Sequence, residues 1–266
     1  MSTLVWICKK FRYEDLTTAA LLIEPNFYFT TYDLVSGYHH IDIASAHQIF
    51  LGFKWVFPGD ITRYFIFTVL AFGLSTACLL FTKIMKPLTK KWRAQGFRVI
   101  VYIDDGINIA ASYKKCDYIT RIVVKDLISA GFTINTEKSR LQPTQVGEWL
   151  GSVINTRDMT FSVPQGKIDK LTSSIYSILL KKRTTAKELA RVAGQLSSMH
   201  ASLGPIVQLL TRGIYTDITS RKNWHSYFSP FWYNNINKEN GYDMKPRETT
   251  SEILFTDASK LNRPMI

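Results

Sequence analysis

Two adjacent aspartates within an apolar, β-branched stretch constrain the fold of this chain more than any other feature. The run 97–103 favours a strand, Asp104 and Asp105 follow it, and a strand pattern resumes at 107–110. The dipeptide Asp105-Gly106 is typical of a tight turn, so the pattern predicts a β-hairpin with both carboxylates at its tip. Two carboxylates in such surroundings are costly unless a cation neutralises them.

Asp33 supplies a third carboxylate, near the end of the earlier strand-like run 27–34. Mg²⁺ binds one or two protein carboxylates, while substrate phosphates and water fill its other positions. Two such ions are the usual machinery of in-line phosphoryl transfer in polymerases and nucleases. Carboxylates held this close repel one another, which raises the pKa of one of them unless divalent cations intervene. We therefore expect the fold to bring Asp33 to the tip of the hairpin.

Four motifs follow one another along the chain: YDLVSGYHHI at 32–41, FLGF at 50–53, FTVLAFGL at 67–74 and YIDD at 102–105. In this order they resemble the reverse transcriptases of retroelements, most closely those of the DIRS or tyrosine-recombinase type. A lone Asp-Asp pair is more often a solvated turn, but a solvated turn does not account for the other three motifs. The resemblance implies that Asp33 and Asp104 bridge two Mg²⁺ or Mn²⁺ ions. Asp105 is less constrained, because adjacent strand residues point to opposite faces.

The resemblance also implies the architecture. The expected fold class is α+β, with a right-hand polymerase palm followed by a helical thumb. The palm is a split βαβ unit whose antiparallel sheet has helices on one face. The expected parts are a remnant of the fingers at 1–26, the palm with its carboxylates and primer-grip hairpin at 27–163, the thumb at 164–215, a connector at 216–250, and the truncated start of a ribonuclease H-like strand at 251–266. The chain would thus lack most of the fingers and nearly all of ribonuclease H.

The spacing of apolar residues predicts the order of helices and strands. The expected elements are strands at 27–34, 50–57 and 64–69, a helix at 75–94, the acidic hairpin, a second helix, strands at 132–135 and 147–163, and helices beyond 165. Gly131 is in the C-cap position of the second helix. Thr185 and Glu188 form a capping-box pattern at the start of a later helix.

The resemblance assigns Tyr38, Phe72 and Gly73 to nucleotide binding. Tyr38 follows Asp33 by five positions, where the family carries a bulky aromatic residue beneath the sugar. A ring there would collide with a 2′ hydroxyl, so the expected substrates are deoxynucleoside triphosphates; the alternative is a core tyrosine on a strand. Gly73 has no side chain, which permits close approach of the backbone to a base or sugar.

Lys138 and the segment Trp149-Leu150-Gly151 complete the candidate site. Lys138 occupies the region where the family keeps a lysine proposed to donate a proton to pyrophosphate, although a surface lysine is an equal alternative. Trp149, Leu150 and Gly151 match the family's hairpin that grips the primer end, and Trp149 could equally be a core anchor. The family's proline before Phe72 is Ala71 here, and its Ala-Pro further on is Ala77-Cys78.

Charge and composition favour the same class of partner. The formal net charge of +12 favours a polyanion, so the expected partner is an RNA or DNA template with its primer. Seven lysine or arginine residues lie between 165 and 200 against two acidic ones, which suits either a solvated face or the lining of a duplex groove. The three cysteines lack the spacing of a disulfide framework or zinc site, which is typical of an intracellular protein of the cytoplasm or nucleus. The uncharged run 65–81 is broken by Gly73, so no membrane partner is expected.

The expected function is that of an RNA-directed DNA polymerase, a nucleotidyltransferase that adds deoxynucleotides to a primer 3′ end. A degenerate or partial copy that binds nucleic acid without catalysis is the main alternative, favoured by Ala71, Cys78 and the short N-terminus. An RNA-directed RNA polymerase shares the two-metal palm, but Tyr38 argues against it. A two-metal nuclease would leave the motifs of Tyr38, Gly73 and Trp149 unexplained.

Overall fold

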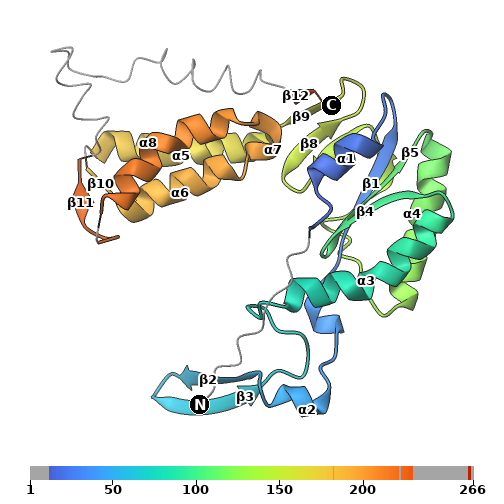
Figure 1. Ribbon diagram of the computed structural model, residues 1–266, viewed down its shortest axis with the longest axis horizontal. Coiled ribbons are helices and arrows are strands. Elements are labelled where there is room, and N and C mark those ends of the chain that lie inside the picture. Colours follow the sequence, from blue (N-terminus) through green and yellow to red (C-terminus); the bar gives the residue numbers. More distant parts are fainter. Residues whose placement is uncertain (1–11, 182, 222, 230–262, 265–266) are drawn as a thin grey trace. The chain divides into compact units, whose positions relative to one another are not determined.

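The computed structural model describes residues 12–181, 183–221, 223–229 and 263–264, and it divides the chain into two compact units (Figure 1). The first unit is Met1–Gln145 and the second is Val146–Ile266. Each unit has a hydrophobic core of its own. The ribonuclease H-like segment predicted at 251–266 lies outside the described residues except for 263–264.

A four-stranded antiparallel sheet forms the centre of the first unit. Its strands are β1 (Tyr28–Asp33), β4 (Arg98–Tyr102), β5 (Asp105–Ala110) and β6 (Arg140–Thr144), in the order β4-β5-β1-β6. The register pairs Tyr28 with Ala110 and Asp33 with Asp105, so the end of β1 meets the start of β5. The position of the carboxylates thus follows from the pairing of two buried strands.

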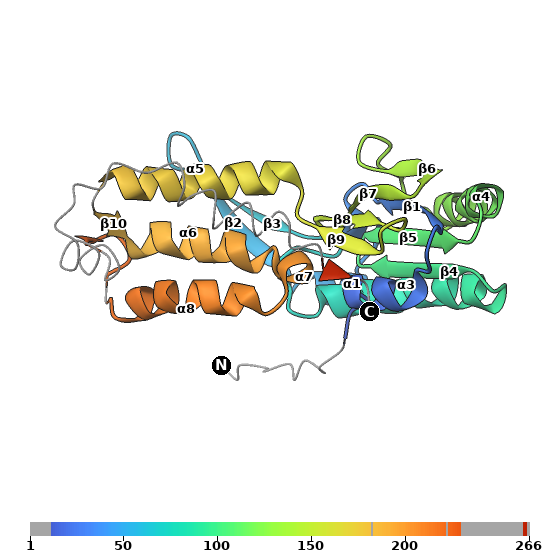
Figure 2. The same ribbon diagram turned by 90° about the horizontal axis from the view of Figure 1, so that it is seen from above.

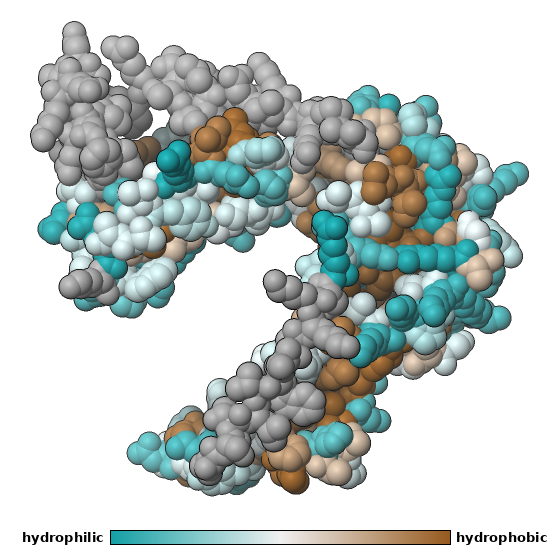
Figure 3. All heavy atoms as spheres, viewed as in Figure 1, coloured by the Kyte–Doolittle hydropathy of each residue, from teal (hydrophilic) through white to brown (hydrophobic). Residues whose placement is uncertain are grey.

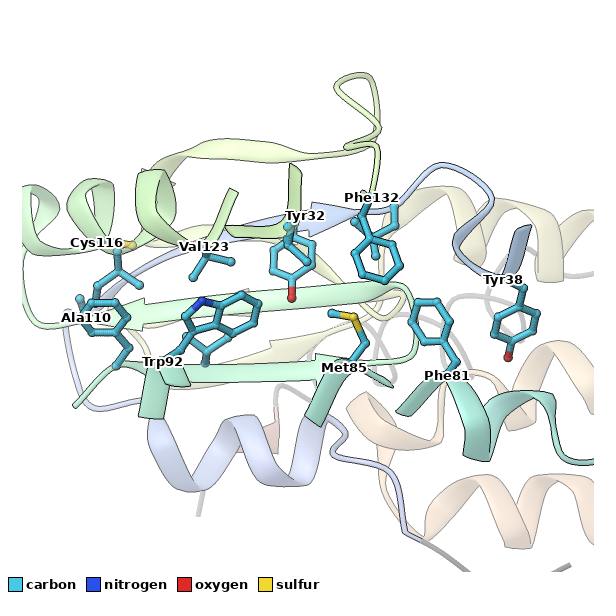
Figure 4. Packing of buried hydrophobic residues seen from close by; sticks show 14 of the residues in the cluster. Tyr32, Tyr38, Phe81, Met85, Trp92, Ala110, Cys116, Val123 and Phe132 are labelled. Atoms are coloured by element: carbon cyan, nitrogen blue, oxygen red, sulfur yellow. The ribbon is translucent and has the colours of Figure 1, made fainter. Parts of the chain in front are cut away.

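Two long helices, α3 (Ala77–Ala94) and α4 (Tyr113–Ser129), pack against the sheet and against each other. Figure 4 shows Trp92, Met85 and Phe81 of α3 in the same buried cluster as Val123 of α4 and Tyr32 of β1. Along the chain the elements run β1-α3-β4-β5-α4-β6, which is the expected split βαβ arrangement. The predicted helix end near Gly131 is also found, with φ of 91° at this glycine.

A hairpin in the first unit carries exposed apolar side chains. Its strands are β2 (Gly52–Phe57) and β3 (Ile61–Ile66), and every residue of both strands is exposed. Apolar surface is visible on this segment in Figure 3. The remaining short elements of the unit are α1 (Leu16–Leu22), the 3₁₀ helix η1 (Gly37–His40) and α2 (Ser45–Gln48).

The strand predicted at 132–135 is wrong. Within this segment only Ile134 forms an isolated bridge, with Leu34, and the strand that joins the sheet is β6, Arg140–Thr144. The backbone N–H of Asn135 donates to the carbonyl of Asp33 at 2.8 Å, and the N–H of Val35 donates to Thr133 at 2.9 Å. The segment is therefore hydrogen-bonded to the chain around the end of β1 without forming a ladder.

The second unit combines a small sheet with a helical bundle. The sheet has the order β12-β9-β8-β7, with strands Arg263–Pro264, Thr160–Ser162, Ser152–Asn155 and Val146–Trp149. The helices are α5 (Gln165–Lys181), α6 (Ala186–Ser197), α7 (His200–Leu203) and α8 (Ile206–Thr219). Two short strands, β10 (Thr184–Thr185) and β11 (Tyr227–Phe228), pair with each other in antiparallel orientation. Figure 2 shows α6 between α5 and α8.

Helix α6 of the second unit begins with a helix cap that the sequence predicted. The Thr185 side chain accepts from the backbone N–H of Glu188, and the Glu188 side chain accepts from the backbone of Thr185, as the capping-box pattern requires. The strands at 146–163 join this unit, because Ser202 of α7 donates to Ser152 and to the carbonyl of Ser162. The sequence pattern placed these strands with the palm, and the predicted domain boundaries stay a prediction.

Within the described ranges, no helix combines the length and the hydropathy that crossing a membrane requires.

Candidate active site

Asp33 and Asp105 lie directly opposite each other in the sheet. Asp33 ends β1, Asp105 begins β5, and the antiparallel register pairs the two residues. Side chains of directly paired residues share one face of a sheet, and successive residues alternate between faces. Because Tyr32 packs into the core beneath the helices, the two carboxylates share the opposite face.

Asp104 is in the hairpin turn beside them. The backbone N–H of Leu34 donates to the Asp104 carbonyl at 3.0 Å, which ties the turn to the end of β1. Ile103 has φ of 55°, a left-handed conformation that is rare for a β-branched residue. Such strain is found at functional sites, where the surrounding structure holds it in place.

The turn itself differs from the one predicted. The structure pairs Tyr102 with Asp105, so the loop consists of Ile103 and Asp104, and the prediction of a turn at Asp105-Gly106 is wrong. Gly106 lies inside β5, where a Cβ would overlap the Tyr32 ring, which is 1% exposed. The glycine is thus needed for close packing of β1 on β5, and the sequence pattern did not reveal this role.

Burial and nearby negative charge raise the pKa values of Asp104 and Asp105. The pKa of Asp105 is raised to about 6 by its burial, and further by the negative charges of Asp104 and Asp33. The pKa of Asp104 is also raised, mainly by burial, with a smaller contribution from the charge of Asp33. The positive charge of Lys138 opposes both shifts. The structure therefore brings three carboxylates and Lys138 into one electrostatic neighbourhood.

The loop that carries Lys138 holds Asp33 through two residues that the sequence pattern did not reveal, Asn135 and Ser139. The Asn135 side-chain amide donates to the Asp33 carboxylate at 3.0 Å, and the backbone N–H of Asp33 donates to the Ser139 hydroxyl at 3.0 Å. Lys138 lies on the same loop, between these two residues. The loop thus orients the Asp33 carboxylate and positions the lysine near the acidic cluster.

Tyr38 is on η1, not on a strand, and its side chain is largely buried. Its ring centroid lies 5.0 Å from that of Phe72 and 5.4 Å from that of Phe81. The preceding residue, Gly37, is packed tightly, since a Cβ there would lie 3.1 Å from the Phe81 ring and 3.2 Å from the Cβ of Asp104. The start of η1 therefore contacts both the aromatic cluster and the acidic turn.

Phe72 and Gly73 form an exposed segment before α3. The Phe72 side chain is 67% exposed, although one side of its ring contacts Tyr38 and His39. Gly73 has φ of 87°, and among the described residues other than its two chain neighbours no atom lies within 4 Å of the position that a Cβ would take. The glycine is therefore required by its backbone conformation, and the space beside it is open.

The predicted primer-grip residues are at the β7–β8 turn of the second unit. Leu150 and Gly151 form the turn, with φ of 46° and 69°. Trp149 is buried at the end of β7, and its indole N–H has no hydrogen-bond partner among the described residues. Trp149 is thus a buried residue, while Leu150 and Gly151 form the tip.

The donor set suits a hard divalent cation. All three acidic side chains offer oxygen, and burial together with their clustered charge raises the pKa of Asp105. Across the described ranges, no three His, Cys, Asp or Glu side chains are placed to hold a metal ion by themselves. Carboxylate oxygens are the ligand type that suits Mg²⁺ or Mn²⁺ ions whose coordination is completed by phosphate oxygens and water.

Comparison with known sequences identifies relatives. A family model described as reverse transcriptase (RNA-dependent DNA polymerase) matches residues 9–154. The retrovirus-related Pol polyprotein from transposon opus of Drosophila melanogaster is 29% identical over 233 residues, 85% of this chain and 21% of that protein. The corresponding polyprotein from transposon gypsy of the same organism is 33% identical over 140 residues, 52% of this chain and 12% of that protein. The chain thus spans about a fifth or less of these relatives.

Solved structures share the fold. A foamy viral protease-reverse transcriptase in complex with an RNA/DNA hybrid matches with a TM-score of 0.65 and 19% identity, over 95% of this chain and 30% of that one. A second foamy viral structure, in complex with double-stranded DNA, matches with a TM-score of 0.64 and 18% identity, over 98% of this chain and 40% of that one. The predicted α+β palm-type fold is confirmed.

Proposed function

This chain belongs to the reverse transcriptase family, of the retrotransposon and retroviral Pol type, and from that premise we propose that it catalyses RNA-directed DNA synthesis. The reaction is attack of a primer 3′ hydroxyl on the α-phosphate of a deoxynucleoside triphosphate, with release of pyrophosphate. The observation that carries the proposal is the register that sets Asp33 opposite Asp105, beside Asp104 in the turn.

Asp33, Asp104 and Asp105 are the proposed ligands of two Mg²⁺ or Mn²⁺ ions. When bound, these ions would stabilise the negative charge on the attacking oxygen and on the departing pyrophosphate. The protein contributes orientation, because the Asn135 amide holds the Asp33 carboxylate and Leu34 holds the Asp104 backbone. Lys138, on the loop bonded to Asp33, is the proposed general acid that donates a proton to pyrophosphate.

Tyr38, Phe72 and Gly73 form the proposed nucleotide site. The Tyr38 ring lies against Phe72 and Phe81 and follows a glycine packed against Asp104, so it is held close to the carboxylates. A fixed ring beneath the sugar would reject a 2′ hydroxyl and select deoxynucleotides. The open space beside Gly73 suits a base or sugar that approaches the backbone.

The proposed macromolecular partner is a primer annealed to an RNA or DNA template. The net charge of +12 supports it, and foamy viral enzymes of the same fold were solved with double-stranded DNA and with an RNA/DNA hybrid. Trp149, Leu150 and Gly151 are proposed to grip the primer end. The motifs at 32–41 and 67–74 further support assignment to the DIRS or tyrosine-recombinase type.

Primer extension on an RNA template tests the activity. We expect the full chain to add deoxynucleotides with Mg²⁺, and Asp104→Asn to abolish addition while still binding the duplex. Asp117→Asn is the matched control, since Asp117 is an acidic residue of α4 that bonds Arg121. Addition that persists at the wild-type rate in Asp104→Asn would refute the proposal.

Binding without catalysis is the second candidate function. The departures from the family pattern at Ala71 and Cys78 favour it, because both flank the proposed nucleotide site. Duplex binding by the wild-type chain, with no extension on either RNA or DNA templates and with either Mg²⁺ or Mn²⁺, would establish this alternative.

A further inference from the structure

A hydrogen bond links the proposed sugar-selecting residue to a cysteine. The Tyr38 hydroxyl donates to the Sγ of Cys78 at 2.9 Å. Cys78 is half-buried in the first turn of α3, and it stands where the family pattern has a proline, whose ring offers no acceptor of this kind. We propose that Cys78 is a positioning residue that fixes the Tyr38 ring for the selection of deoxynucleotides. This inference rests on the proposed polymerase function.

The Tyr38 ring is held at both ends. Phe72 and Phe81 contact the ring, and η1 fixes the backbone next to Gly37. Aromatic pairs prefer offset-stacked or edge-to-face arrangements, but over a range of centroid distances of about 4.5–7 Å, so ring contacts alone leave some tilt and sliding possible. The hydroxyl is the far end of the side chain, so a bond there restricts the tilt most effectively.

Cys78 and Phe81 act from the same helix. They are three residues apart in α3, which places them on one face of it. The helix is fixed in turn, because Phe81, Met85 and Trp92 are fully buried in the core. The thiol acceptor therefore has a rigid base, and the distance from the Tyr38 hydroxyl to the Cys78 sulfur is set by the packing of α3 on the sheet.

The ring is also positioned relative to the acidic turn. A Cβ at Gly37 would lie 3.2 Å from the Cβ of Asp104, so the chain just before Tyr38 has no room to shift toward the carboxylates. The pKa of Tyr38 is raised by its burial and by the bond to Cys78, so the hydroxyl keeps its proton and remains a donor. A small tilt of this ring would change the space available to a 2′ hydroxyl.

Single-nucleotide incorporation of dATP and ATP by the full chain tests the inference. We expect Cys78→Ala to raise the ratio of ATP to dATP efficiency roughly fivefold, mainly through the KM for ATP. Cys78→Ser keeps an acceptor and should stay close to the wild-type ratio. In Tyr38→Phe, which lacks the donor, adding Cys78→Ala should change the ratio no further, because the two residues act through one bond. Thr89→Ala, further along α3, is the control for the helix.

The outcomes separate the two proposals. Equal losses for ATP and dATP in Cys78→Ala would show a merely structural role and overturn the inference. If the wild-type chain incorporates nothing, the polymerase proposal fails. Equilibrium binding of dATP and ATP to the primer-template complex with Ca²⁺ then tests the inference, through the ratio of ATP to dATP affinity in the wild type and in Cys78→Ala. If neither nucleotide binds the wild-type complex, both proposals are overturned.

Discussion

Asp105 has a carboxyl group whose charged form is unfavourable in the metal-free chain. Its pKa is raised to about 6 by burial and by its acidic neighbours, from an ordinary value of 3.8. A raised pKa means that the folded state favours the protonated form, so the stabilisation is complete below about pH 3.8 and is lost as the pH rises through about 6. At neutral pH the group therefore lowers the free energy of unfolding.

We expect Asp105→Asn to stabilise the metal-free chain at pH 7.5 by on the order of 1–2 kcal/mol, allowing for solvent screening, and to leave stability unchanged near pH 3.5. Urea unfolding at the two pH values measures the difference. Asp117→Asn, which removes a surface ion pair, should change stability by less than about 0.5 kcal/mol. Mg²⁺ should raise the melting temperature of the wild type more than that of Asp105→Asn. A destabilised Asp105→Asn at pH 7.5 would contradict this electrostatic account.

The sequence was informative at the residue scale where a residue type carries chemistry. Asp33, Asp104 and Asp105 stand out because carboxylates in apolar sequence need a cation, and the structure brings them together. Their catalytic role stays a prediction. Asn135 and Ser139 were missed because their contacts with Asp33 span more than a hundred residues of sequence and depend on a loop rather than on a periodic pattern.

Elements were predictable to the extent that one face of each is apolar. The helices α3 and α4 and the capping box of α6 follow from spacing and local chemistry. The strand β6 was missed because Arg140–Thr144 includes a proline and three polar residues and pairs with β1 through an irregular register. The acidic turn was predicted at Asp105-Gly106 instead of Ile103-Asp104, because Gly106 was interpreted as a turn residue. Gly106 instead lies in β5, where it accommodates the Tyr32 ring.

The contact between β1 and β5 gives a test at the scale of elements. We expect Gly106→Ala to destabilise the chain by about 2–3 kcal/mol, because the Tyr32 ring is fully buried and has no space to withdraw. Gly52→Ala is the matched control in an exposed strand, where the nearest atom to the added Cβ is 3.7 Å away. Urea unfolding of both variants measures the difference. Similar stability of the two variants would show that the sheet adapts to the added methyl group.

At the scale of the whole molecule, charge decides the expected partner. Lys187 and Arg191 are exposed on α6, four residues apart, in a basic part of the sequence. We expect their double alanine variant to weaken duplex binding and to reduce the slope of log affinity against log salt by about 2. The control is the double variant Lys115→Ala and Lys125→Ala on α4, which removes the same amount of charge from another helix. Unchanged binding in the α6 variant would identify this basic face as a merely solvated one.

The grouping of the chain into units was the least predictable feature. The strands β7, β8 and β9 belong to the same unit as helices α5 to α8, and Ser202 of α7 donates to Ser152 and to the carbonyl of Ser162. A sequence pattern reveals which segments are strands but not which neighbours they join, because such contacts depend on single polar pairs. The element order of the first unit was predictable because the family motifs follow it.

The central claim is that Asp33 and Asp104, remote in sequence, act together in deoxynucleotide addition. Single-turnover incorporation on an RNA-templated primer with Mg²⁺ tests it most directly. The variants to compare, at equal duplex occupancy, are Asp33→Asn, Asp104→Asn and Asp117→Asn. We expect the first two variants to lose at least about a thousandfold in rate, as the loss of a preorganised charge at the reacting centre would cause, and Asp117→Asn to match the wild type. Incorporation by Asp33→Asn at the wild-type rate would contradict the account.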